Sequence, residues 1–246
     1  MSSYIKNLLR PWKNPISYTL LIAIKLLGFK EVISGPFKGL KFSHRFPTKP
    51  MLIGVWEKEI SFIWDSLQKF KYIIDVGAAE GFYAVGLARK YPEKMIYAFE
   101  MNLSNQRLLQ NVITDNLVKN IEIRGKCEYD DLKDFGGKLD DALIVMDCEG
   151  YELELLNANS LTIFKNTYIL VELHEMYSPG CTNELRERFS STHNIQEIEG
   201  KHRDINDLPK QLKFLKYLYP NELLLDFMDE GRPNPMNWLY MKPKTN

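Results

Sequence analysis

The feature that most constrains this chain is an apolar run that ends in an acid and leads through a glycine-containing turn into a helical segment. Residues Tyr72–Val76 form the run, Asp75 is its acid, and Gly77 and Gly81 lie in the turn. In open α/β sheets, ligands bind outside the carboxyl ends of the strands, and glycine lets a bound molecule approach the backbone. A second run, Met95–Glu100, ends in another acid, and a carboxylate about 20 residues further along can bind a ribose. The sequence therefore predicts a ligand-binding turn at this edge of a sheet.

The spacing of the two glycines separates two classes of cofactor. They are arranged as Gly77-x-x-x-Gly81, whereas the dinucleotide fingerprint is G-x-G-x-x-G. This spacing argues against a nicotinamide-dependent oxidoreductase.

Apolar runs and helical segments alternate along the chain, which is typical of an α/β fold. The predicted strands are Tyr72–Val76, Met95–Glu100, Ile121–Arg124, Ala142–Met146, Tyr168–Leu173, Asn194–Glu199 and Trp238–Met241. The predicted helices are Tyr83–Lys90, Asn105–Asn116 with Ser104 as its N-cap, Tyr151–Leu156 and Glu184–Ser190. Because near-continuous apolar strands fit burial on both faces, we predict a seven-stranded, mostly parallel, doubly wound sheet with an antiparallel final strand.

Charge is distributed unevenly along a chain whose formal net charge is zero. Residues 1–50 hold nine basic residues and one acid, so this segment has a formal charge of +8 and the remainder −8. We expect a basic N-terminal extension over residues 1–50, helical in its first part, and one domain over residues 51–246 with an insertion at about 204–236. Zero net charge gives no general reason to expect nucleic acid as a partner.

The apolar run Ile16–Ile24 lies between Lys13 and Lys25. It is shorter than the ~20 apolar residues that a helix needs to span a bilayer, and no small-residue cleavage site follows it. Two interpretations stay open: a helix that packs on the body, or one that lies on a membrane surface carrying anionic lipid. The three scattered cysteines form neither a disulfide framework nor a zinc site. We therefore expect a cytoplasmic protein, with peripheral membrane contact under the second interpretation.

Acids and a histidine follow the fourth and fifth predicted strands. In extended backbone, alternate side chains share a face, so we expect Asp147 beside Glu149, and Glu172 beside His174. Because histidine titrates near neutrality, His174 is the predicted base, and Asp147 and Glu172 complete the catalytic group. The alternative is that these acids cap helices or pair with basic residues. Asp147, Glu149 and Glu172 also offer hard oxygen ligands to Mg²⁺, an alternative to the metal-free site that we expect.

A tryptophan and a glutamate stand next to each other in the segment Gly54-Val55-Trp56-Glu57. The pair could close over the amino group of a ligand, or Trp56 could belong to the core. The sequence leaves both interpretations open.

Several of these motifs together resemble the FkbM family of S-adenosylmethionine (SAM)-dependent methyltransferases, which have the Rossmann-like class I fold. The resemblance covers roughly residues 50–180 and rests on the segments Gly54–Glu57, Asp75–Tyr83, Tyr97–Glu100, Met146–Glu152 and Val171–His174. It implies that Asp75 and Gly77 border the methionine part of SAM. It also implies that Glu100 holds the ribose and that Asp147 lies by the reacting methyl group. The further cofactor contacts that it implies are Glu57, Ala78, Gly81, Met101 and Cys127.

Two positions depart from the family pattern. Met101 stands where a proline usually follows the acid, and Met146 stands where lysine is frequent. Neither change removes a group that the cofactor chemistry requires. The resemblance implies an O-methyltransferase that acts on a hydroxyl of a small molecule, sugar or glycan. The alternative is a non-catalytic module that binds SAM or a nucleotide.

Overall fold

The computed structural model describes residues 31–42, 47–232 and 234–244. The described residues form two compact units: those up to Ser61 together with Lys201–Pro235, and Phe62–Gly200 together with the residues from Met236 onward. We call them the small unit and the sheet unit. None of the helices in the described part of the chain is long and apolar enough to cross a membrane. The helices predicted within residues 1–30, and the membrane contact predicted for them, lie outside the described residues.

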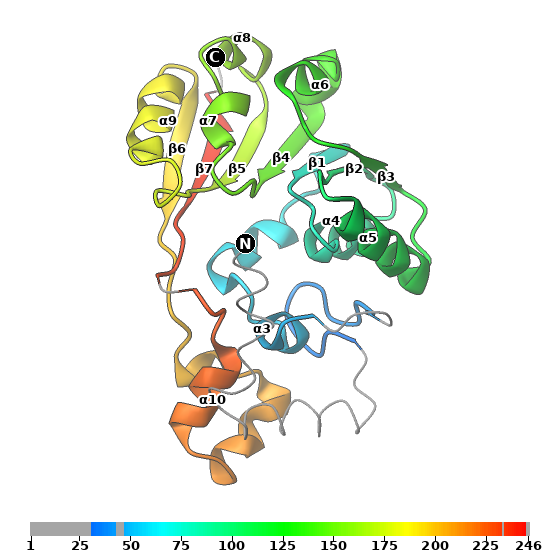
Figure 1. The fold of residues 1–246 in the computed structure, drawn as a ribbon, viewed down its shortest axis with the longest axis vertical. Coiled ribbons are helices and arrows are strands. Elements are labelled where there is room, and N and C mark those ends of the chain that lie inside the picture. The colour runs from blue at the N-terminus through cyan, green and yellow to red at the C-terminus, as the bar shows by residue number, and fades with distance from the viewer. Residues whose placement is uncertain (1–30, 43–46, 233, 245–246) are drawn as a thin grey trace. The chain divides into compact units, whose positions relative to one another are not determined.

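The sheet unit contains one seven-stranded sheet with the order β3-β2-β1-β4-β5-β7-β6 (Figure 1). Its strands are β1 (Tyr72–Val76), β2 (Met95–Phe99), β3 (Ile121–Arg124), β4 (Ala142–Met146), β5 (Tyr168–Glu172), β6 (His193–Ile198) and β7 (Trp238–Pro243). Neighbouring strands from β3 to β5 pair in parallel, and β7 pairs antiparallel with both β5 and β6. The predicted fold class, including the antiparallel last strand, is confirmed.

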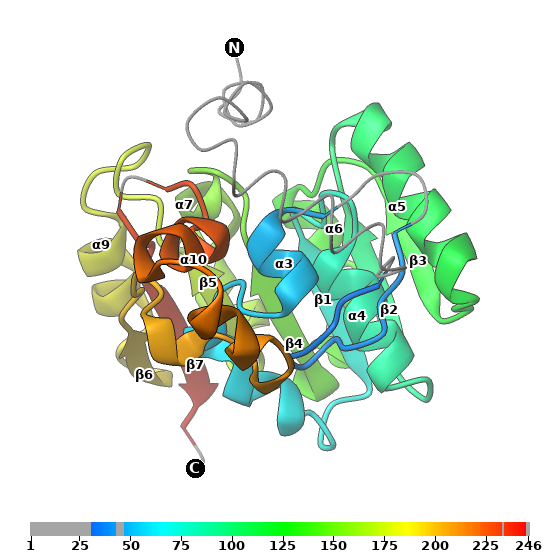
Figure 2. The same cartoon turned by 90° about the horizontal axis from the view of Figure 1, so that it is seen from below.

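Helices flank both faces of this sheet. Figures 1 and 2 show α4 (Phe82–Lys90) and α5 (Leu103–Asn116) on one face. The helices on the other face are α6 (Tyr129–Lys133), α7 (Glu152–Leu155), α8 (Ser160–Ile163) and α9 (Cys181–Phe189). Two 3₁₀ helices, η1 (Lys58–Asp65) and η2 (Gly136–Asp141), precede β1 and β4. The predicted helices are therefore present with shifted ends, whereas the short helices α6 and α8 were not predicted.

The buried core explains why the positions of the strands could be predicted from the sequence. Every residue of β4 is buried, as the fully apolar run Ala142–Met146 requires. Alternate strand residues such as Ile74, Ile144 and Ile169 join the apolar cluster beneath α7 and α9. Complete burial of an aliphatic side chain of this size contributes ~1.5–3 kcal/mol, so this cluster fixes the strand positions that carry the site.

The N-terminus of α5 corrects one prediction. Asn102, rather than Ser104, is the N-cap, because its side-chain oxygen accepts a hydrogen bond from the Ser104 N–H at 2.8 Å. Ser104 lies within the first turn. Both residue types are good N-caps, and the backbone leaves the extended conformation at Asn102.

The small unit has its own apolar core. Its helices are α3 (Lys49–Ile53), η3 (Ile205–Asp207), η4 (Lys210–Tyr217) and α10 (Asn221–Met228). Leu52 and Ile53 pack against Leu224 and Phe227 in this core. The helix α3 holds Pro50 in its first turn, where no helical N–H is needed. Residues 36–39 form a turn, and Glu31 and Lys41 on either side of it form an isolated antiparallel bridge.

Candidate active site at the carboxyl edge of the sheet

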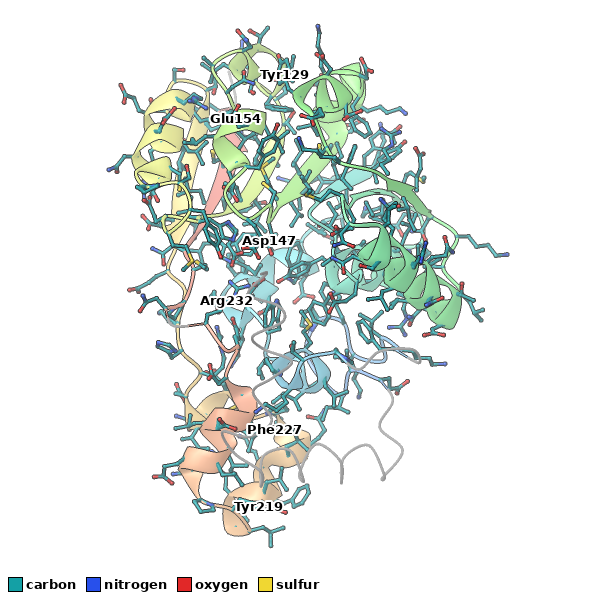
Figure 3. All side chains as sticks on the ribbon, in the orientation of Figure 1. Tyr129, Asp147, Glu154, Tyr219, Phe227 and Arg232 are labelled. Atoms are coloured by element: carbon teal, nitrogen blue, oxygen red, sulfur yellow. The ribbon has the colours of Figure 1, made fainter. Side chains whose placement is uncertain are left out.

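The order of the sheet reverses between β1 and β4, and the sequence-predicted turn lies at this reversal. Gly77 follows β1 with a φ of 89°. A Cβ atom at Gly77 would lie 1.8 Å from the carbonyl oxygen of Asp147, which follows β4 (Figure 3). Only glycine combines this conformation with so close an approach. The two strand ends therefore meet backbone to backbone, at the position where open α/β sheets bind ligands.

Glu100, which follows β2, is hydrogen-bonded to the backbone of the glycine turn. Its buried carboxylate accepts hydrogen bonds from the Ala79 N–H at 2.9 Å and from the Asn102 N–H at 2.7 Å. Ala79 has a φ of 47°, which is uncommon for a residue with a side chain. The carboxylate thus stabilises a strained turn and stands at the edge of the same site.

Asp75 is a buried acid with an unsatisfied oxygen. Its side chain is almost completely buried, and Oδ2 has no hydrogen-bond partner among the residues that the structure describes. Burial first, and the charge of Glu100 to a smaller extent, raise the pKa of this carboxyl to about 7 against the opposing effect of a backbone hydrogen bond from Ala84. A buried polar atom without a partner is costly in a native protein, so Asp75 is a position at which a ligand donor or a cation would be stabilising.

The remaining predicted cofactor contacts of the sheet unit have different environments. Gly81 begins α4 with a φ of 93°, and a Cβ there would lie 2.4 Å from Leu109. The Ala78 N–H donates to the carbonyl oxygen of Phe99 at 2.9 Å, so that donor is already used within the protein. Met101 is exposed. Cys127 is buried in the core, and burial, followed by nearby acids, raises the pKa of its thiol to about 12.

The structure brings together the predicted catalytic residues around one buried imidazole. His174 Nε2 lies 3.2 Å from Glu172 Oε2 and 3.4 Å from Asp147 Oδ1. Glu149 Oε2 is at 3.9 Å. On the opposite side of the ring, Nδ1 lies 2.7 Å from Oε1 of Glu152. Four carboxylates therefore surround one histidine.

This environment contradicts the near-neutral titration expected for His174. Burial opposes the charged imidazole, but hydrogen bonds to Glu152 and Glu172 and the charge of Asp147 outweigh it and raise the pKa to about 11. The imidazole is therefore protonated at neutral pH and has no free lone pair to accept a proton. The raised pKa argues against His174 as the base at neutral pH, and its catalytic role stays a prediction; the ring does lie beside Asp147 and Glu172, as expected.

Glu152 is the residue of this cluster that sequence reasoning missed. Its side chain is fully buried, and Oε1 also accepts a hydrogen bond from the Gly150 N–H at 3.1 Å. Burial opposes ionisation, but the contacts with His174 and this N–H lower the pKa of the carboxyl below its ordinary value. Its place in the motif Glu149-Gly150-Tyr151-Glu152, three residues beyond another acid, was the available signal.

Glu149 differs from the prediction of an extended backbone after β4. The strand ends at Met146, and Glu149 has a φ of 55°. The left-handed turn, rather than alternation along a strand, brings Glu149 toward His174. Tyr177 stacks on the imidazole with ring centroids 6.0 Å apart.

Three of these side chains are also close enough to share a metal ion. One ligand atom each from Asp147, Glu149 and His174 lies within 4.8 Å of the others. A metal would require His174 without a proton on the coordinating nitrogen. Because that nitrogen faces carboxylates, a metal and the proton compete for the same position.

The Trp–Glu pair lies in the small unit. Glu57 is buried with a φ of 43°, and its Oε1 is 2.7 Å from Arg232 Nη2. The Arg232 guanidinium lies 5.0 Å from the centroid of the Trp56 ring, which is half-buried and outside the apolar core of the unit. Glu57 is thus engaged in an ion pair, and its predicted cofactor contact stays a prediction.

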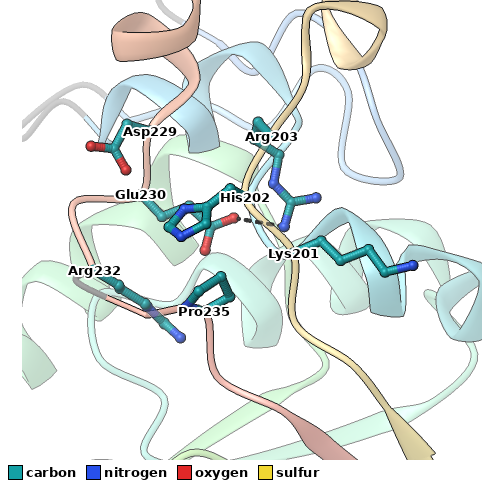
Figure 4. Close-up of a pocket in the computed structure, with 7 residues that line it drawn as sticks. All are labelled: Lys201, His202, Arg203, Asp229, Glu230, Arg232 and Pro235. Atoms are coloured by element: carbon teal, nitrogen blue, oxygen red, sulfur yellow. Dashed lines mark ion pairs between the residues drawn. The ribbon is translucent and has the colours of Figure 1, made fainter.

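Arg203 and Glu230, whose side chains are 3.3 Å apart, border a cavity of about 20 Å³ in the small unit (Figure 4). Arg203 also pairs with Glu59. The cavity has room for about one water molecule, and the two arginines that line it, Arg203 and Arg232, are already held in ion pairs.

The similarity of this chain to known proteins lies in its three-dimensional structure. No family model matches the chain, and no curated protein matches it. Solved structures do resemble it. One is a precorrin-6y C5,15-methyltransferase from Geobacter metallireducens GS-15, with 12% identity, a TM-score of 0.53, and coverage of 83% of this chain and 97% of that one.

Two further solved structures resemble the chain with similar TM-scores. An rRNA methylase from Streptococcus thermophilus is 12% identical with a TM-score of 0.50, and the match covers 76% of this chain and 97% of that one. A fibrillarin–Nop5p complex is 14% identical with a TM-score of 0.50, and the match covers 87% of this chain and 92% of that one. At this identity the similarity establishes the fold, which is the Rossmann-like fold of class I methyltransferases.

Proposed function

We propose that this protein is a SAM-dependent methyltransferase of the FkbM type that methylates a hydroxyl group of a small molecule or carbohydrate. The observation that carries the proposal is the site at the reversal between β1 and β4. There, a buried Asp75 oxygen lacks a hydrogen-bond partner within the described part of the chain, and Glu100 holds the glycine turn. The fold is consistent with this function, because class I methyltransferases bind their cofactor at that edge.

The residues present fit SAM. Gly77 and Gly81 let the turn pack against the Asp147 carbonyl and Leu109, where a Cβ would clash, and so hold its backbone at the edge where a ligand would bind. Asp75 offers an acidic oxygen for the positively charged methionine part, and Glu100 offers a carboxylate for the ribose hydroxyls. Bound SAM supplies a methyl group on a sulfonium, which needs no covalent enzyme intermediate. We propose Ala78, Met101 and Cys127 as further contacts along this edge.

Asp147 is the group that we propose to orient the acceptor hydroxyl and to take its proton. Its side chain is 29% exposed, whereas His174 and Glu172 are almost completely buried. A partly exposed carboxylate next to a buried imidazolium can meet an acceptor, while the ring fixes the orientation of the carboxylate. His174 then acts as a fixed cation that positions Asp147 and Glu172. The proposed base is Asp147, and a positioned base typically contributes ~10²–10⁴-fold to the rate.

Turnover separates a methyltransferase from a module that only binds SAM. We would measure formation of S-adenosylhomocysteine from SAM with a panel of hydroxylated metabolites and glycans. The proposal predicts turnover with at least one acceptor and loss of most of it in Asp147→Asn. SAM binding without turnover across a broad panel would instead favour the non-catalytic module, and NAD(H) binding in place of SAM would contradict the proposal.

A further inference from the structure

The helix η4 of the small unit presents three different rows of side chains. A 3₁₀ helix has three residues per turn, so residues i and i+3 lie above one another. One row is buried in the core of the unit, where it packs near α10, and consists of Leu212 and Leu215. The second row is basic and consists of Lys210, Lys213 and Lys216; the third consists of Gln211, Phe214 and Tyr217.

Large apolar side chains at the end of this helix are exposed to solvent. Phe214 is 54% exposed, Tyr217 is 91% exposed, and Leu218, the C-cap residue, is 66% exposed. We call these three residues the apolar tip. Single exposed apolar residues are ordinary, but neighbouring ones of this size mark interaction surfaces.

The basic row beside the apolar tip has an unbalanced positive charge. Within the described part of the chain, none of its three lysines forms an ion pair. The segment Leu208–Asn221 contains no aspartate or glutamate. Two other lysines of the unit, Lys49 and Lys58, are by contrast paired with Asp226 and Asp207.

We propose that the apolar tip and the basic row of η4 dock the protein on a bilayer surface that contains anionic lipid. A surface that combines exposed aromatic and aliphatic side chains with lysines is suited to the interface, where rings insert among the headgroups and lysines contact their phosphates. Each lysine near such a surface attracts anionic lipid, and the attraction falls with salt. Leu218 and the absence of arginine favour lipid over single-stranded nucleic acid, which binds through base stacking and arginine contacts.

The test is co-sedimentation of the full chain with vesicles of phosphatidylcholine alone or with phosphatidylserine added. Phe214→Ser with Tyr217→Ser and Leu218→Ser removes the apolar tip, and Lys210→Ala with Lys213→Ala and Lys216→Ala removes the basic row. The control removes three exposed lysines of the sheet unit: Lys119→Ala, Lys133→Ala and Lys165→Ala. Because all of these side chains lie on the surface, an unchanged melting temperature verifies folding.

We expect the wild type to bind only the anionic vesicles, and salt to weaken this binding. The lysine substitutions should reduce the affinity roughly 100-fold, and the tip substitutions at least tenfold. The control variant should bind as the wild type does. A fourth variant, in which Lys6, Arg10, Lys13 and Lys25 are replaced by alanine, separates the N-terminal segment. The proposal is overturned if the wild type binds no vesicles, or if only this fourth variant loses binding. It is also overturned if the tip substitutions dissociate a dimer in light scattering, or abolish oligonucleotide binding, without affecting vesicles.

Discussion

Oε1 of Glu152 lies 2.7 Å from Nδ1 of His174, and both side chains are buried at the edge where the sheet meets its candidate active site. The contact places a carboxylate behind the ring, while Asp147 and Glu172 face its other nitrogen. These contacts favour a protonated histidine between acids, and this is why we propose that His174 positions Asp147 instead of acting as the base.

Glu152→Gln should keep the shape of the cluster but remove the negative charge behind His174. We expect a loss of about 1.5–3 kcal/mol of stability, the range for hydrogen bonds to charged groups, and a lower pKa for His174. Chemical denaturation measures the first effect and ¹⁵N NMR of the imidazole the second. Glu154→Gln, on the exposed side of α7, is the control and should change neither. A His174 pKa that is unchanged in Glu152→Gln would contradict this account of the cluster.

His174 should make stability depend on pH in the alkaline range. Its folded pKa, raised to about 11, lies above its ordinary value of 6.5. Its stabilising contribution is therefore complete below about pH 6.5 and is lost as the pH rises toward 11. The stability difference between wild type and His174→Gln, measured by urea unfolding, should shrink from pH 7 to pH 10. A difference that stays constant over this range would show that the imidazole is not held as a cation.

Asp75 should make stability depend on pH in the acidic range. Its folded pKa of about 7 lies above its ordinary value of 3.8, so its contribution is complete below pH 3.8 and is lost as the pH rises through 7. Asp75→Asn should remove this loss, which is on the order of 4 kcal/mol if the whole shift is realised. Urea unfolding between pH 4 and pH 8 measures it, with Asp140→Asn at an exposed position as the control. Parallel pH profiles for wild type and Asp75→Asn would exclude this assignment.

Gly77→Ala should damage the protein because the added Cβ would lie 1.8 Å from the Asp147 carbonyl oxygen and φ is positive. We expect a loss of more than about 2 kcal/mol, since backbone must move. Gly137→Ala, where no atom lies within 4 Å of the added Cβ, is the matched control and should change stability little. Thermal unfolding compares the two variants, and equal melting temperatures would mean that β1 and β4 do not meet as closely as described.

Local patterns were sufficient to predict the sheet. The alternating segment Ile121–Arg124 and the apolar run Ala142–Met146 match β3 and β4 at both ends. Asp75, Glu100, Asp147 and Glu172 were found because acids that follow parallel strands must gather at one edge. These features depend on residues that are close in sequence, which is why a single sequence reveals them.

The features that the sequence did not predict depend on contacts between residues that are far apart in the chain. Glu152 reaches His174 across a chain separation of 22 residues, and no local pattern predicts the pKa that results. Arg232 pairs with Glu57 over a separation of 175 residues, so the composition of the small unit could not be read from either segment alone. The left-handed conformation of Glu149 is a third example, because nothing in its side chain favours positive φ.

Calorimetric titration with SAM tests the central claim most directly. Glu100 is the predicted ribose contact, and losing a hydrogen bond to a charged group costs ~1.5–3 kcal/mol. The account predicts that wild type binds SAM and that NADH does not bind. Glu100→Ala, titrated well below its own melting temperature because the change also removes two backbone hydrogen bonds, should bind SAM about tenfold to a hundredfold more weakly. Asn105→Ala, a change outside the proposed contacts, should bind as wild type does. Wild-type protein that binds no SAM, or a Glu100→Ala variant with unchanged affinity, would contradict the account.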